Sequence, residues 1–210
     1  MTVPNFHETY RRVEERFNRT LEDEGLTVEG PLDNTELLSR YEGQLVELAG
    51  NTYEFSDESS AEEWINGCTS YLGFKAAILA NEQQELVGFT WAHPFSIERD
   101  ITVDGARDFV EEKREELAVG SQDVLYSTAL AIDPEYQGKG LGSGLALAAL
   151  NLCREEYPDG SLLFYRTKPT NSTTRYMSET LGAKQVDIPD TQSGKIIWHG
   201  YIPPLETSRN

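Results

Sequence analysis

Cysteine and lysine are scarce in this chain of 210 residues, which has two cysteines, Cys68 and Cys153, and only six lysines. Two cysteines are too few for a disulfide framework or a cysteine-based metal site, so we expect reduced thiols, no bound metal and a cytoplasmic location. Long apolar runs are also missing, because the longest uncharged stretch, residues 140–153, is shorter than the roughly 18 residues that a membrane span needs. Charge crowds residues 6–21, so we expect no signal peptide.

Positive charge is the second shortage, since 18 basic residues face 36 acidic ones and the formal charge is −18. Such a chain repels polyanions, so we expect neither nucleic acid nor an anionic membrane as a partner. The acids comprise 25 Glu and 11 Asp, and the bases 12 Arg and 6 Lys. Abundant Glu with scarce Lys resembles the proteins of salt-accumulating cells, and an ordinary acidic protein is the alternative.

The length suits one domain, which we expect to span residues 1–210. Within it we expect a helical part at 1–70, a sheet core at 74–202 and an insertion at 96–122. Helices first and strands interleaved with helices afterwards predict a mixed α+β fold rather than a doubly wound sheet.

Apolar spacing, turn residues and capping patterns place the individual elements. Residues 25–34 carry Gly25, Gly30 and Pro31 and are expected to form a loop, and Ser60 with Glu63 has the spacing of a capping box. The helices are expected at 6–21, 35–48, 60–68, 106–119, 141–155 and 171–181. The strands are expected at 74–80, 86–93, 124–132, 162–167, 184–188 and 195–202.

A glycine-rich loop at residues 137–144 separates the expected strand 124–132 from the helix that follows. Alternate glycines let a backbone approach a ligand closely, and the helix N-terminus attracts negative charge, so the pattern favours a phosphate ligand. The alternative is that the glycines only allow the helix and strand to pack closely. Ser143 after Gly142 excludes a Walker A loop, and Ser143 or Leu145 at the last position excludes a dinucleotide fingerprint.

The spacing that does fit is Gln-x-x-Gly-x-Gly, formed by Gln137, Gly140 and Gly142. Ala-Ile-Asp-Pro-Glu-Tyr precedes it and a helix of small residues and leucine follows it, which resembles the acetyl-CoA signature of the GNAT acyl-CoA N-acyltransferase superfamily. Asn171, eleven residues before Gly182, resembles the second block of that superfamily. The two blocks stand on elements in the matching order from about residue 74 to residue 202.

The resemblance implies a GNAT fold: a central, mostly antiparallel twisted sheet, splayed at the CoA site and flanked by helices, here with extra N-terminal helices. It implies acetyl-CoA as cosubstrate, with the backbone of Leu130 and Ile132 pairing with pantetheine and the Leu130 amide serving as oxyanion donor. Lys139 either reaches a phosphate or faces solvent. The expected CoA-binding residues are Leu130, Ile132, Gln137, Gly138, Lys139, Gly140, Leu141, Gly142, Ser143 and Asn171.

Two catalytic positions depart from the superfamily pattern. Ser178 stands where many relatives have a proton-donating tyrosine, and Tyr126 stands where some have a glutamate base. We expect both at the reaction centre, Ser178 as a weak proton donor and Tyr126 at the acceptor site, although a phenol with an ordinary pKa near 10 is a poor base. Asp123, Glu98 and His93 remain alternative bases.

The expected function is transfer of an acetyl group from acetyl-CoA to a primary amine by direct attack, without a covalent enzyme intermediate. A catalytically inactive module that binds or senses acyl-CoA is the alternative, because both departures weaken the catalytic pattern. The acceptor is a small molecule or a peptide, and the oligomeric state, a homodimer included, stays open.

The charge of −18 also makes a prediction about salt. At about 1 M salt the Debye length is about 3 Å, so screening removes the long-range self-repulsion of an acidic body and its repulsion of an anionic ligand. We expect the melting temperature and acetyl-CoA turnover to rise as potassium chloride goes from dilute to molar. A melting temperature and a turnover that both peak in dilute buffer and fall steadily with salt would contradict the interpretation as a protein of salt-accumulating cells.

Overall fold

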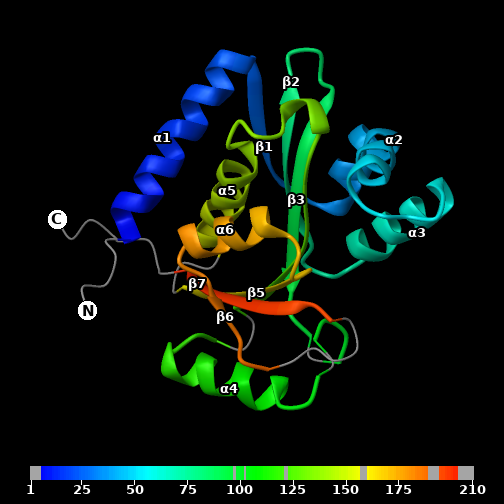
Figure 1. Cartoon of the computed structure of the whole chain (residues 1–210). Coiled ribbons are helices and arrows are strands. Elements are labelled where there is room, and N and C mark those ends of the chain that lie inside the picture. Colours follow the sequence, from blue (N-terminus) through cyan, green and yellow to red (C-terminus); the bar gives the residue numbers. More distant parts are fainter. Residues whose placement is uncertain are drawn as a thin grey trace. The chain divides into compact units, whose positions relative to one another are not determined.

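The computed structural model describes residues 6–96, 98–101, 103–120, 123–156, 160–188 and 194–202. Figure 1 shows the chain with its helices and strands labelled. The helices are α1 (Phe6–Glu24), α2 (Asn34–Thr52), α3 (Glu58–Thr69), α4 (Ala106–Glu116), α5 (Leu141–Glu156) and α6 (Ser172–Thr180), with a 3₁₀ turn at Pro134–Tyr136. The strands are β1 (Leu26–Leu32), β2 (Lys75–Asn81), β3 (Leu86–Pro94), β4 (Val124–Ile132), β5 (Ser161–Thr167), β6 (Lys184–Gln185) and β7 (Ile196–Ile202).

The chain forms two compact units. The N-terminal unit combines His7–His93 with Thr128–Leu152, so it holds α1 to α3, β1 to β3, the end of β4 and most of α5. The C-terminal unit is formed by the described parts of Pro94–Ser127 and Cys153–Asn210, so it holds α4, the start of β4, β5, α6, β6 and β7.

In the N-terminal unit, helices cover both faces of the strands. The core on one face joins α2 and α3 to the strands through Leu37, Leu45, Ile65, Phe89 and Trp91. The core on the other face joins α1 and α5 to the strands through Phe17, Leu79, Val87, Leu141 and Leu145. Figure 1 accordingly shows α2 with α3 on one side of β2 and β3, and α1 with α5 on the other.

The C-terminal unit has one core, which α4 closes by packing Ala106 and Val110 against the strand residues Leu162, Phe164 and Ile197. In its strands β4 runs parallel to β5, from Val124–Leu162 to Ser127–Tyr165, while β7 runs antiparallel to both β5 and β6.

The strand order of the seven-stranded sheet is β1-β2-β3-β4-β5-β7-β6. Of the pairs with a described register, β4 with β5 is parallel and the other four are antiparallel. The expected mixed, mostly antiparallel α+β fold is therefore confirmed. None of the helices in the described ranges is long and apolar enough to cross a membrane.

The N-terminal part departs from the sequence expectation in two places. Residues 26–32, expected as part of a loop, form β1, which pairs antiparallel with β2, so the part at 1–70 is not helical throughout. The cap of α3 is also different, because Asp57 accepts the Ser60 amide at 2.8 Å and Ser60 is therefore not the N-cap of a capping box with Glu63. The capping box of this part belongs to α2, where the Asp33 carboxylate accepts the Glu36 amide and the Glu36 carboxylate accepts the Asp33 amide.

Most other elements were predicted to within a few residues. Strand β4 is confirmed at both ends, and α5 begins at Leu141 as expected. The hairpin at 184–188 and 195–202 is shorter, with β6 limited to Lys184–Gln185. Part of its expected turn, residues 189–193, lies outside the described residues.

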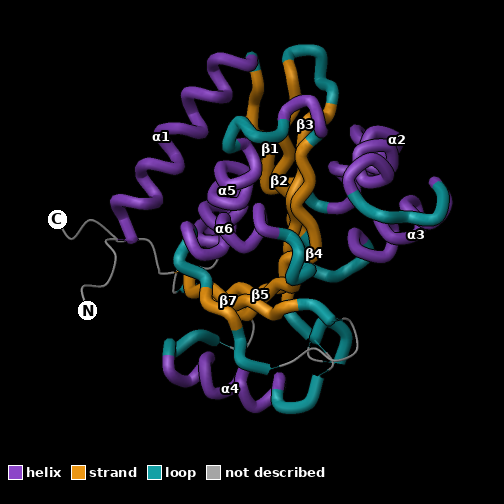
Figure 2. The backbone as a smooth tube through the Cα atoms, in the orientation of Figure 1, coloured by secondary structure: helices purple, strands orange, loops and turns teal. Residues whose placement is uncertain are grey.

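Helix α1 lies against α5, and Gly144 makes this contact possible. A Cβ atom at Gly144 would overlap the ring of Phe17, which is buried against α5. Figure 2 shows the two helices as neighbouring tubes. The close approach fixes α1 beside the beginning of α5, where the glycine-rich loop ends.

We expect Gly144→Ala to destabilise the protein by about 1–3 kcal/mol, because the added methyl group must displace Phe17. Gly43→Ala in α2 is the matched control, since nothing lies within 4 Å of its added Cβ and alanine favours a helix by up to about 1 kcal/mol. Urea unfolding of both variants measures the difference. A Gly144→Ala variant as stable as Gly43→Ala would show that α1 does not pack this closely on α5.

Candidate acyl-CoA site

The glycine-rich loop connects β4 to α5 within the N-terminal unit. Asp133 caps the 3₁₀ turn by accepting the Glu135 amide at 2.8 Å, and the chain then passes Gly138 and Gly140 with φ values of 79° and 87°. These left-handed values are strained for other residues, so both glycines are required by the turn. Helix α5 starts directly afterwards, with its first backbone bond from the Gly144 amide to the Gly140 carbonyl at 3.2 Å.

The amides of Leu141, Gly142 and Ser143 precede that first helical bond. They therefore belong to the positive end of the α5 dipole, where anions are stabilised. Nothing lies within 4 Å of a Cβ built at Gly138, so its side of the loop is open. Oriented amides beside an open, left-handed backbone suit the pyrophosphate of a CoA ester.

The backbone of β4 next to this loop is bonded by side chains. The Gln137 amide nitrogen donates to the carbonyl oxygen of Ile132 at 2.9 Å. Two residues earlier, the hydroxyl of Tyr53 accepts the Leu130 amide at 3.1 Å and donates to the Leu130 carbonyl oxygen at 2.9 Å. The structure thus brings Leu130, Ile132 and Gln137 together with the loop, and it adds Tyr53, which the sequence did not indicate.

Helix α1 supplies charged neighbours to the loop. A Cβ at Gly140 would lie 3.0 Å from Nε of Arg16, so the Arg16 guanidinium stands directly at the loop. Lys139 is ion-paired with Glu24 at 2.6 Å, and its ammonium lies 5.0 Å from the centre of the Tyr136 ring. The Lys139 carbonyl oxygen lies 3.5 Å from the Thr20 hydroxyl.

The loop has two cations beside it, Lys139 and Arg16. Lys139 was expected either to reach a phosphate or to face solvent; its ammonium is paired with Glu24, and a contact with phosphate stays a prediction. Arg16 is the cation at Gly140, and sequence reasoning missed it because Arg16 lies more than 120 positions earlier in an arginine-rich helix. The packing of Phe17 on Gly144, together with the contacts of Thr20 and Glu24 with Lys139, holds α1 and therefore Arg16 at the loop.

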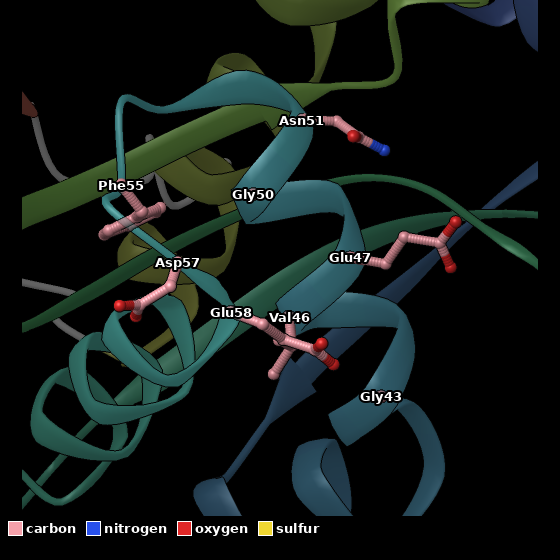
Figure 3. A pocket seen from close by; sticks show the side chains of 8 residues that line it. All are labelled: Gly43, Val46, Glu47, Gly50, Asn51, Phe55, Asp57 and Glu58. Atoms are coloured by element: carbon pink, nitrogen blue, oxygen red, sulfur yellow. The ribbon is translucent and has the colours of Figure 1, made fainter.

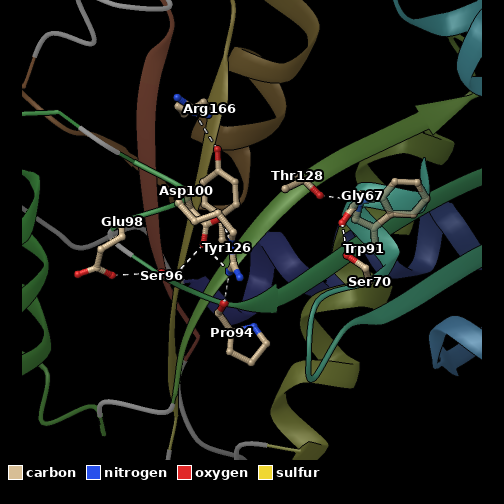
Figure 4. Close-up of polar contacts among 11 residues, drawn as sticks. Gly67, Ser70, Trp91, Pro94, Ser96, Glu98, Asp100, Tyr126, Thr128 and Arg166 are labelled. Atoms are coloured by element: carbon tan, nitrogen blue, oxygen red, sulfur yellow. Dashed lines mark hydrogen bonds and ion pairs between the residues drawn. The ribbon is translucent and has the colours of Figure 1, made fainter. Parts of the chain in front are cut away.

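The remaining expected site residues belong to the C-terminal unit. Tyr126 is 5% exposed, and its hydroxyl accepts a hydrogen bond from Nε of Arg166 at 2.8 Å, as Figure 4 shows. Asn171 is the N-cap of α6 and accepts the Thr174 amide at 2.9 Å. Ser178 is 1% exposed and donates its hydroxyl proton to the Thr174 carbonyl oxygen at 2.6 Å. Catalytic roles for Tyr126 and Ser178 stay predictions.

The three residues considered as alternative bases are Glu98, His93 and Asp123. Glu98 is exposed and paired with Arg107 at 2.6 Å, and this hydrogen bond lowers the pKa of its carboxyl. His93 is 1% exposed and lies 4.3 Å from Tyr71, ring centre to ring centre. Asp123 precedes β4, and its carboxylate lies beside Gly120. The third histidine of the chain, His199, has its pKa lowered to about 4 by burial and by Lys113 and Lys184, so it is a weak base at neutral pH.

A groove of about 440 Å³ lies between α2 and α3. Figure 3 shows the side chains that line it, among which Phe55, Asp57 and Glu58 come from the connection between the two helices and the start of α3. In the described ranges no group of three or more His, Cys, Asp or Glu side chains is arranged to hold a metal ion.

Comparison with known proteins identifies the family. The model of the acetyltransferase (GNAT) family matches residues 39–182, which include β4, the glycine-rich loop, Asn171 and Ser178. No curated protein matches the chain.

Solved structures share the fold at low sequence identity. The ribosomal-protein-S18-alanine N-acetyltransferase from Escherichia coli is 14% identical, with a TM-score of 0.56 over 88% of this chain and 99% of that one. A GNAT-family protein from Desulfovibrio desulfuricans, described as a putative acetyltransferase, is 16% identical, with a TM-score of 0.57 over 84% and 99%.

A third solved structure contains coenzyme A. The PaiA N-acetyltransferase from Thermoplasma acidophilum, solved in complex with coenzyme A, is 15% identical, with a TM-score of 0.53 over 83% and 97%. Since the family model covers well over half of the sequence and the folds agree, this chain belongs to the GNAT family of acetyltransferases.

Proposed function

We propose that the protein is an N-acetyltransferase that moves the acetyl group of acetyl-CoA to a primary amine. The observation that carries the proposal is the juxtaposition, in one unit, of the α5 N-terminus and its left-handed glycines with the Leu130 backbone. Amides for a pyrophosphate and a backbone edge for a pantetheine arm therefore stand on adjoining segments. The Arg16 guanidinium adds a cation at the same loop.

The chain's own groups have defined tasks in this reaction. The amides of residues 141–143 and Arg16 hold phosphate oxygens, and the Leu130 amide donates to the oxygen of the thioester carbonyl as negative charge develops there. The amine nitrogen bonds to the carbonyl carbon and loses a proton to water, the carbon–sulfur bond breaks, and the CoA thiolate takes up a proton. Alignment of an uncharged amine with the thioester supplies much of the rate, so a strong protein base is not required.

Ser178 is proposed as a weak source of the proton for the thiolate. Its hydroxyl already donates to the Thr174 carbonyl oxygen inside α6, so that bond must break before the proton can be used. A hydroxyl is also far less acidic than the usual catalytic acids. We therefore assign Ser178 an assisting role.

The CoA assignment predicts that Gly140→Asp weakens acetyl-CoA binding at least about tenfold. The new carboxylate would meet Arg16, strain a backbone with φ of 87° and repel phosphate. Gly194→Asp is the matched control, because Gly194 also has a positive φ, of 65°, and gains the same charge in the β6–β7 connection. Calorimetry measures the affinity of both folded variants for acetyl-CoA. If Gly140→Asp binds acetyl-CoA as tightly as Gly194→Asp and wild type do, the glycine-rich loop is not the phosphate site.

For the chemical step, we expect Ser178→Ala to lower turnover by about tenfold or less, with acetyl-CoA affinity nearly unchanged. Ser172→Ala, an exposed position at the start of the same helix, is the control for the loss of a serine hydroxyl. Free thiol release from acetyl-CoA with a panel of amines measures turnover. Identical rates in wild type and Ser178→Ala would leave Ser178 without a catalytic part, and no thiol release with any amine would favour the inactive acyl-CoA-binding module.

A further inference from the structure

In the part of the chain that the structure describes, the edge of β4 at Leu130 is closed by a side chain and not by a strand. Along a strand, successive residues direct their backbone polar groups to opposite sides. The Ala129 carbonyl accepts the Thr90 hydroxyl at 2.9 Å and the Asp133 amide donates to the Val87 carbonyl at 2.8 Å, so these odd-numbered residues face β3. Leu130 and Ile132 therefore face the other way.

On that other side the described pairing of β4 with β5 reaches only Ser127–Tyr165. Within the described residues, the backbone bonds of Leu130 go to Tyr53, and the Ile132 carbonyl goes to Gln137. A buried backbone donor or acceptor costs about 1–3 kcal/mol when it has no partner, so these two side chains satisfy an edge that would otherwise be unfavourable.

Tyr53 is suited to this position. It is the C-cap of α2, where its amide donates to the Ala49 carbonyl at 2.8 Å, and its ring contacts Trp64 at 5.2 Å between ring centres. Burial raises the pKa of its hydroxyl, so the group stays protonated and keeps a proton to donate. One hydroxyl that both donates and accepts reproduces the two bonds that the amide groups of an extended chain would make with Leu130.

An open groove lies beside the segment that follows Tyr53. Residues 53–57 form the connection between α2 and α3, and the groove between these helices is lined by Phe55 and Asp57 of the same connection. Tyr53 is thus anchored by its ring contacts and its two bonds to Leu130, and open space lies beside its neighbours.

We propose that Tyr53 is a placeholder that holds the Leu130 edge in the ligand-free protein and is displaced by the pantetheine arm of acyl-CoA. The proposal rests on the proposed function, since it assigns the Leu130 edge to that arm. The Tyr53 hydroxyl and the pantetheine arm cannot both bond the Leu130 amide and carbonyl at once. Binding of the arm therefore requires the two Tyr53 bonds to break, and the affinity for acyl-CoA is lower than the site alone would give.

Tyr53→Phe tests the placeholder, because it removes the hydroxyl that bonds Leu130 and keeps the ring. The variant should unfold at a lower temperature without ligand and should bind acetyl-CoA about five- to tenfold more tightly, as expected for losing hydrogen bonds worth about 1 kcal/mol from the free state only. The affinity for 3′,5′-ADP, which carries phosphates and no pantetheine, should not change. Calorimetry with both ligands gives these values.

Tyr41→Phe is the matched control. Tyr41 lies in α2 of the same unit, is 2% exposed and hydrogen-bonds Glu29 through its hydroxyl at 3.3 Å, with no bond to Leu130. It should lose stability and keep the wild-type affinity for acetyl-CoA. Equal or weaker acetyl-CoA binding by Tyr53→Phe, in a wild type that binds, would overturn the placeholder and leave the proposed function standing. A wild type that binds neither ligand would overturn both.

The wild-type chain provides a test that does not depend on a folded variant. With tyrosine labelled by ¹³C at the ζ carbon, the Tyr53 signal should move on addition of acetyl-CoA and stay in place on addition of 3′,5′-ADP, while the Tyr41 signal stays in place with both. A Tyr53 signal that acetyl-CoA leaves unmoved would mean that the hydroxyl keeps its bonds in the complex, and the placeholder would be wrong.

Discussion

The backbone edge of β4 at Leu130 and Ile132 is the constraint from which the rest of the site follows. Strand residues have polar groups on two sides, and β3 satisfies only one of them here. Because the described register with β5 ends at Ser127, the other side must find partners elsewhere. It finds Tyr53 at the end of α2 and Gln137 in the glycine-rich loop, so a helix and the loop are tied to the same edge.

Helix α1, which precedes the family match, adds contacts to the glycine-rich loop. The family model begins at residue 39, so all of α1 lies outside it, yet α1 packs through Phe17 on Gly144 and brings Arg16 to Gly140. In a chain with a net charge of −18, an anionic ligand meets a repelling field at long range. Contact-range donors such as the α5 amides and Arg16 offset this field where the phosphates would lie, and Glu24 meanwhile neutralises Lys139.

The sequence indicated the parts of the molecule that depend on local pattern. Strand β4 and the start of α5 were predicted because an apolar run, a Gly-rich turn and a small-residue helix follow one another, and left-handed φ values at Gly138 and Gly140 match that pattern. Strand β1 was missed because Gly30 and Pro31 resemble a turn, and only pairing with β2 makes the segment a strand. The cap of α3 was misplaced because Asp57 and Ser60 are both good capping residues, and the backbone decides between them.

Tyr53, Arg16 and the partner of Lys139 have no local signal at all. Each reaches the site from a residue far away in sequence: Tyr53 bonds Leu130 across 77 positions, and Lys139 pairs with Glu24 across 115. Such contacts are set by which helices pack on which face of the strands, and a single sequence gives no measure of that. The groups that line a site can therefore be predicted when the backbone supplies them and are missed when tertiary packing does.

The same distinction bears on the chemistry. The two catalytic positions that depart from the superfamily pattern both carry side chains engaged within the fold, Tyr126 with Arg166 and Ser178 with Thr174. The backbone donor at Leu130, by contrast, is held by a single tyrosine hydroxyl at the end of a helix. Breaking the two Tyr53 bonds would expose the Leu130 amide, which is already oriented by the strand, so the donor proposed for the thioester carbonyl belongs to the backbone. For the reaction proposed above, alignment and backbone donors therefore offer a better account than a dedicated acid and base.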